Sequence, residues 1–147
     1  LVVDELSAIR VPQDYLTRRD ALRQANGALV IVTQQLESAK MQADSSKASL
    51  KQEEDLKKVY DAAYDKVVTQ PATQLVPLLP KLQALSQGAA QAGDFLQQQG
   101  PRVSFNNNAV QFPTPDQVTQ YNALMSTISA NAQALTQAQT AVQNGLQ

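Results

Sequence analysis

The chain contains no cysteine, no histidine and no tryptophan among its 147 residues. Without cysteine it has no disulfide bonds, no thiolate nucleophile and no zinc site built on sulfur. Without histidine it lacks the most frequent general base, the most frequent transition-metal ligand and the usual sensor of physiological pH. These absences leave few routes to catalysis and direct attention to binding and structure.

Aromatic residues and net charge are also scarce. Phe and Tyr make up 5% of the chain, so the core must be built mainly from Leu, Val, Ile and Ala, which suits a slender bundle. The formal net charge of −1 provides no global field to attract nucleic acid or an anionic membrane. No apolar run approaches the roughly 20 residues that span a bilayer. We therefore expect no nucleic-acid partner and no transmembrane segment.

The polar clusters do not predict an active site. Glu53, Glu54 and Asp55 are consecutive, so they point in different directions from a helix and cannot converge by themselves. Ser38 and Lys40 are close in sequence, but nothing beside them indicates an oxyanion hole. The glycines are scattered and form no phosphate-binding loop. We therefore predict no catalytic residue, no metal site and no cofactor.

A seven-residue repeat of apolar positions predicts a long helix over residues 13–69. Residues 44–46, Asp-Ser-Ser, either cap a second helix or lie on the exposed face of a continuous one. We favour continuity because Lys, Gln, Glu and Ala around this site have high helix propensity. Beyond the site the apolar series resumes with a shift of phase. The apolar positions are Leu22, Ala25, Leu29, Val32, Leu36, Ala39 and Ala43, then Leu50, Leu56, Val59, Tyr60, Ala63 and Val67.

Prolines mark the end of this helix and the start of the next. The residue before Pro71 is pushed out of the α region, which ends the first helix. Together with Pro77 and Pro80, Pro71 predicts a turn-rich stretch that leads into a helix over residues 74–99. Gly100 then provides a residue suited to the end of a helix, and a proline follows it.

Residues 102–112 form the one β-hairpin candidate. Val103 and Phe105 alternate before a run of three asparagines, and Val110 and Phe112 alternate after it. Asparagine tolerates the positive φ angle that tight turns require. Because an isolated hairpin is marginally stable in water, we expect this one to pack on a helix.

Thr114 and Pro115 mark the start of a last helix over residues 115–146, as its N-cap and first helical residue. After Asp116 this helix carries no charged residue, and its polar positions are Gln, Asn, Ser and Thr. An uncharged polar face can pack against another protein without desolvating ions. We therefore expect a protein partner or self-association through this helix. Its apolar positions are Val118, Tyr121, Met125, Ile128, Ala132, Leu135, Val142 and Leu146, and Gln139 interrupts the series.

Together these elements predict an all-α fold. It is an elongated antiparallel bundle of three or four helices in a single domain, residues 1–147, with one small hairpin before the last helix. A helix over 13–69 would be on the order of 85 Å long, and the two later helices about 39 and 48 Å. A four-helix bundle broken near 44–46 and a long helix flanked by two shorter ones both fit. Residues 1–11 form a short helix or an extended segment.

This composition favours a non-catalytic interaction or structural protein, and the charge-poor helices favour an exported component of a bacterial envelope, secretion or surface assembly. The chain begins at Leu1 and shows no charged segment followed by an apolar one. The chain is therefore either a mature, processed protein or an excised piece of a longer one. We expect the protein to be secreted, periplasmic or part of the cell envelope. The alternatives are a virion or phage assembly component, and a bundle that inserts into membranes or binds an apolar ligand.

The hairpin is the predicted partner-binding site, because binding residues are concentrated on loops held by a rigid scaffold. Its asparagines offer neutral donors and acceptors, which suit a protein or a glycan better than phosphates. In the alternative interpretation the hairpin is a connector whose phenylalanines cover the open end of the core. The predicted binding residues are Phe105, Asn106, Asn107, Asn108 and Phe112.

Overall fold

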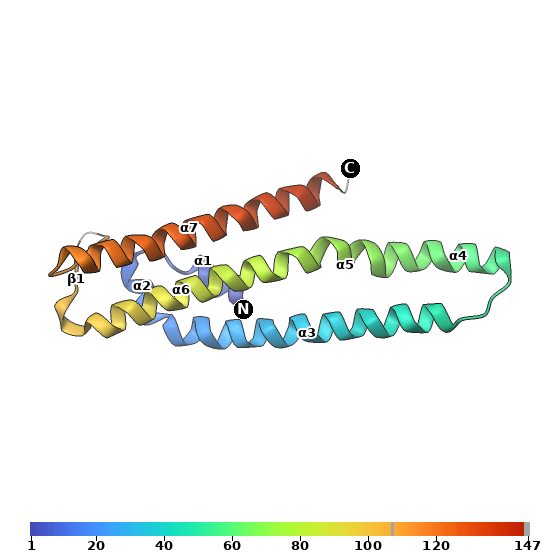
Figure 1. The fold of residues 1–147 in the computed structure, drawn as a ribbon, viewed down its shortest axis with the longest axis horizontal. Coiled ribbons are helices and arrows are strands. Elements are labelled where there is room, and N and C mark those ends of the chain that lie inside the picture. Colours follow the sequence, from blue (N-terminus) through green and yellow to red (C-terminus); the bar gives the residue numbers. More distant parts are fainter. Residues whose placement is uncertain (107, 146–147) are drawn as a thin grey trace.

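The computed structural model describes residues 1–106 and 108–145. Within these residues, three long helical segments run antiparallel along the molecule (Figure 1). The prediction of an elongated all-α bundle is thereby confirmed. Two short helices, α1 (Val2–Ser7) and α2 (Pro12–Thr17), lie against the long segments at the amino end.

The first long segment is α3 (Arg19–Ser49), which runs through residues 44–46 without interruption. The chain leaves the helix at residues 50–53 instead, where Leu50 and Glu53 are extended. One helix over residues 13–69 is therefore a wrong prediction. The break falls where the apolar series changes phase, and the reversal lets the Tyr64 hydroxyl donate to Asp44 Oδ1 over 2.7 Å.

The second long segment, which we call the rod, is helical from Glu54 to Gln99. The predicted turn-rich stretch at its prolines is absent from it. Five residues of π-helix precede Pro71, and the Gln70 N–H donates to the Asp65 carbonyl. This wider turn offsets the missing N–H of proline. Pro77 lies instead in a short 3₁₀ turn, which is tighter than an α-helical turn. The rod consists of α4 (Glu54–Tyr64), η1 (Asp65–Thr69), α5 (Gln70–Leu75), η2 (Val76–Leu78) and α6 (Leu79–Gln99).

Small residues on α6 let three other elements approach its backbone. Leu22 of α3 and Ala89 of α6 are fully buried in one cluster. A Cβ on Gly93 would collide with the carbonyl oxygen of Tyr15, so α2 lies directly on the α6 backbone. On another side, a Cβ on Gly88 would meet Ile128 of α7 at 3.3 Å. The core therefore depends on close helix contact more than on large side chains.

The chain reverses between α6 and the last helix through η3 (Gly100–Arg102), β1 (Ser104–Asn106) and β2 (Ala109–Gln111). The strands pair antiparallel with Phe105 opposite Val110. Gly100 and Asn108 both have positive φ, as expected for a helix end and a tight turn.

The third long segment is α7 (Pro115–Asn144). Thr114 is its N-cap as predicted, since Thr114 Oγ1 accepts from the Gln117 N–H. Tyr121 is buried, whereas Val118, which we expected to face the core, is exposed. Leu146 lies outside the described residues.

Two glycines in helices should respond in opposite ways to alanine. Gly93→Ala should lower the free energy of unfolding by about 1–3 kcal/mol, because the methyl group forces α2 away from α6. A Cβ on Gly27 in α3 meets no atom within 4 Å, so Gly27→Ala should raise the free energy of unfolding. The expected gain is about 0.5–1 kcal/mol, from helix propensity. Chemical denaturation measures both changes, and a tolerated alanine at position 93 would contradict the proposed close contact.

Candidate interaction site

The hairpin closes one end of the bundle. The Phe112 ring lies 5.8 Å from that of Phe95 on α6 and 5.2 Å from that of Tyr121 on α7, centroid to centroid. Phe105 is half-buried on β1, so neither predicted phenylalanine projects freely from the tip. Asn106 and Asn108 are exposed, and Asn107 lies outside the described residues.

Away from this end, α3 and the rod continue together past α1, and the end of α7 lies beside residues 65–77 of the rod (Figure 1). We call residues 30–49 of α3 and 54–75 of the rod the arm. In the body of the molecule, α1 packs across both helices through Val2, which contacts Ala25 and Leu29. Along the arm, the same stripe of α3 is half-buried or exposed, with Val32 53% exposed.

One side of the arm is mainly apolar. On the rod, Val67 is 72% exposed and Leu75 is 53% exposed, although both belong to an apolar series. Of the residues that form this side, which we call the arm face, none is charged. The arm face consists of Val32, Leu36, Ala39 and Ala43 on α3, and Leu56, Val59, Ala63, Val67, Pro71 and Leu75 on the rod.

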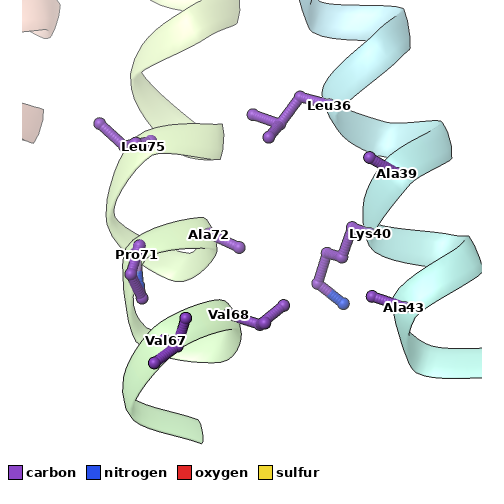
Figure 2. A pocket seen from close by; sticks show the side chains of 9 residues that line it. All are labelled: Leu36, Ala39, Lys40, Ala43, Val67, Val68, Pro71, Ala72 and Leu75. Carbon is purple, nitrogen blue, oxygen red and sulfur yellow. The ribbon is translucent and has the colours of Figure 1, made fainter. Parts of the chain in front are cut away.

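A groove with a volume of about 300 Å³ lies at the middle of the arm face (Figure 2). Leu36 and Lys40 point from α3 toward Val68 and Ala72 of the rod. The lysine is the one ionisable residue in the lining. The groove is therefore a site for aliphatic side chains and has little to hold a charged ligand.

Polar contacts hold the far end of the arm closed beside this face. Asp44 Oδ2 accepts from Lys40 Nζ at 2.6 Å, and its other oxygen accepts from the Tyr64 hydroxyl at 2.7 Å. Asp61 pairs with Lys47 at 3.3 Å and with Lys57 at 2.7 Å. The Lys47 ammonium also lies 4.6 Å from the centre of the Tyr64 ring. We call this network the clamp.

The clamp changes the acidity of its members. Hydrogen bonds from Lys40 and then Tyr64 lower the pKa of Asp44 below its ordinary value of 3.8. The hydrogen bond from Lys57 is the largest cause of the lowered pKa of Asp61. Because its phenol donates to the Asp44 carboxylate, Tyr64 has a pKa raised to about 12. The three groups therefore favour one charge state, with both carboxylates ionised and the phenol neutral.

The arm face was not predicted as a site, because its apolar residues were expected to lie in the core. Leu50, Leu56, Val59 and Val67 are exposed, which corrects that expectation. The phase shift at Leu50 was the available signal. It showed that the later apolar residues do not continue the stripe of α3, but not that they lack a covering helix.

A family model described as "Protein of unknown function (DUF3053)" matches residues 1–143. The chain belongs to the DUF3053 family. It is 50% identical over 139 residues to the protein called "Uncharacterized protein YiaF" in Escherichia coli K12, and the match covers 95% of this chain. Identity and coverage are the same for the proteins of that name in Escherichia coli O157:H7 and Shigella flexneri.

The chain spans 59% of the length of these curated relatives. No solved structure matches it. Among the described residues, no helix is both long and apolar enough to cross a membrane. Nor do three or more acidic side chains gather in the described part of the chain as a metal ion would require.

The clamp makes a pH-dependent prediction. Because the pKa of Asp44 is lowered on folding, its ionised form stabilises the fold above about pH 3.8, and this stabilisation is lost as the pH falls through the lowered pKa. Asp44→Asn should therefore lower the melting temperature at neutral pH, and the difference from the unmodified chain should shrink in acid. Tyr64→Phe should also lower the melting temperature at neutral pH.

Glu37→Gln is the matched control, because Glu37 lies on the same helix and belongs to no ion pair in the described residues. Its melting temperature should stay within about a degree or two of the unmodified chain, as for most surface changes. An Asp44→Asn effect that is no larger than that of Glu37→Gln would show that the clamp does not hold the arm.

Proposed function

We propose that this chain is a non-catalytic interaction and structural module that binds another protein surface through the arm face. The observation that carries this proposal is an apolar surface along two helices that no described element covers, beside a body in which α1, α2 and α7 pack on α6. Large contiguous apolar patches on a protein surface mark interaction sites. The clamp supports it because it fixes the arm helices relative to each other and so presents a preformed surface.

In the proposed setting, the module is an exported component of a bacterial envelope, secretion or surface assembly. The charge-poor helices support this assignment, and so does the bacterial source of the relatives. From Val67 onward the chain has four charged residues, Lys81, Asp94, Arg102 and Asp116.

Two further surfaces are candidates for association. The exposed side of α7 consists of Ala, Ser, Thr and Gln, so a partner or a second copy can approach it without desolvating charges. The hairpin tip exposes Asn106 and Asn108. We rank the tip below the arm face because Phe112 is used to close the bundle.

A second candidate function is binding of an apolar ligand. Between α1, the rod and α7 lies a cavity of about 380 Å³, lined by six leucines and Val3, with Ser7 and Gln139 as the polar members. This volume is at the small end of the range for ligand sites. Its lining suits an aliphatic chain and offers nothing to bind a charged head group.

Photo-crosslinking in living cells tests the proposed function. A photoreactive phenylalanine derivative is placed at Ala39 on the arm face or, as the control, at Met41. Met41 is 71% exposed and lies about 200° further round α3. We expect a defined crosslinked product from position 39 and little from position 41. Equal crosslinking at both positions would contradict a role for the arm face.

Fractionation of the same cells tests the compartment. We expect the protein with the envelope or periplasmic material. Recovery with the cytoplasmic fraction would overturn the exported assignment and leave the arm-face proposal standing.

A further inference from the structure

We propose that the arm face is covered by the arm of a second copy, so that two chains join through an antiparallel four-helix bundle. This inference rests on the proposed function, because it names the occupant of the same surface. It commits to a second copy of this chain as the partner.

The direction in which the arm face points indicates a partner of two helices. On the rod, Ala63, Val67 and Pro71 each precede by one position a residue that faces α3. One residue of an α-helix corresponds to about 100° of rotation. Each arm helix therefore has a second contact direction nearly at a right angle to the first. Helices of a four-helix bundle have two neighbours in this arrangement, and a single helix in the groove would leave the outer residues uncovered.

The arm of this chain has the length that the uncovered surface requires. In the body, α1 already covers the α3 stripe at Ala25 and Leu29. From Val30 to Ser49 the free stretch is about 30 Å long, by the rise of an α-helix. A second arm fits this stretch when it runs antiparallel, because the body of its own chain then lies beyond residues 50–53. A parallel copy would drive its body into α1.

Antiparallel pairing also makes the side chains complementary. A two-fold axis at the middle of the stretch passes close to Ala39 on α3. It places Leu36 over Ala43 of the partner subunit, so a large side chain meets a small one. On the rod the same axis passes near Pro71, which Figure 2 shows at the level of Lys40 in the groove. Each copy would thus insert aliphatic side chains where the other has space.

The charges of the arm permit self-association. The arm and its connecting loop, residues 30–75, contain seven acidic and six basic residues, so two copies repel each other little. The arm face itself contributes no charge, and Lys40, the one ionisable residue in the lining of its groove, pairs with Asp44. The same balance disfavours an anionic membrane as the occupant, since the arm has no excess of basic residues.

The contact area reaches the range of specific dimers. Two helices about 10 Å wide and 30 Å long present about 600 Å² per copy, and so about 1,200 Å² in total. That is the lower end of the range for specific protein interfaces. We therefore expect a dimer that dissociates on dilution.

Sedimentation equilibrium of the 147-residue chain tests the inference. The monomer mass is 15.9 kDa, and we expect the mass to approach twice this value as the concentration rises. Val67→Glu and Ala39→Glu should each raise the dissociation constant at least about tenfold, because the interface would bury a carboxylate. Met41→Glu, an equally exposed apolar position off the arm face, should leave it unchanged. Circular dichroism confirms that each variant folds.

Single cysteines test the antiparallel arrangement, and the background is clean because the chain has no cysteine. Ala39→Cys should form a disulfide-linked dimer under mild oxidation, because both copies of this residue lie near the axis. Met41→Cys should not. A mixture of Leu36→Cys and Ala43→Cys chains should yield the mixed disulfide in preference to either symmetric one. Preference for the symmetric products would exclude the antiparallel pairing.

The outcomes separate this inference from the proposed function. A chain that stays monomeric, or a dimer that Val67→Glu leaves intact, overturns the second copy as the occupant. If position 39 then still crosslinks to a different protein in cells, the interaction module stands with another partner. If position 39 crosslinks to nothing and the chain is monomeric, both proposals fail.

Discussion

Close approach of helix backbones at α6 is the constraint on which the rest of the structure depends. With few aromatic residues, the chain cannot fill a wide core, so its stability must come from helices in direct contact over small side chains. The backbone of α2 packs on Gly93, and α7 packs on Gly88. Leu22 of α3 fills the remaining side. The position of each of these elements therefore depends on its contact with α6.

The same constraint explains why the arm is different. Apolar residues continue along α3 at the spacing of Ala25 and Leu29, but α1 ends and no described element takes its place. The π-helical turn before Pro71 keeps Val67, Pro71 and Leu75 in register along one side of the rod. An extended apolar face thus results from regular continuation of the bundle pattern, and the clamp joins the two helices at its far end.

Local signals predicted the local structure. The Thr114 cap, the positive φ of Gly100 and of an asparagine in the hairpin, and the all-α class all follow from residue chemistry that acts over a few positions. The break at residues 50–53 was missed because it depends on a contact between residues distant in sequence. The helical path through Pro71 was missed because proline normally ends a helix. Tyr64 must reach Asp44, and the π turn absorbs the proline. Periodicity identified apolar faces but not which of them another helix covers, so the predicted site was placed on the hairpin.

Amide hydrogen exchange at two protein concentrations tests the central claim most directly. The account predicts that amides of residues 30–49 and 54–75 exchange faster on dilution, because dissociation leaves a two-helix arm with few buried contacts. Amides of α6 (Leu79–Gln99) should exchange at the same rate at both concentrations, since the body is complete in one chain. Arm amides whose protection does not change with dilution would contradict the claim that the arm requires a second copy.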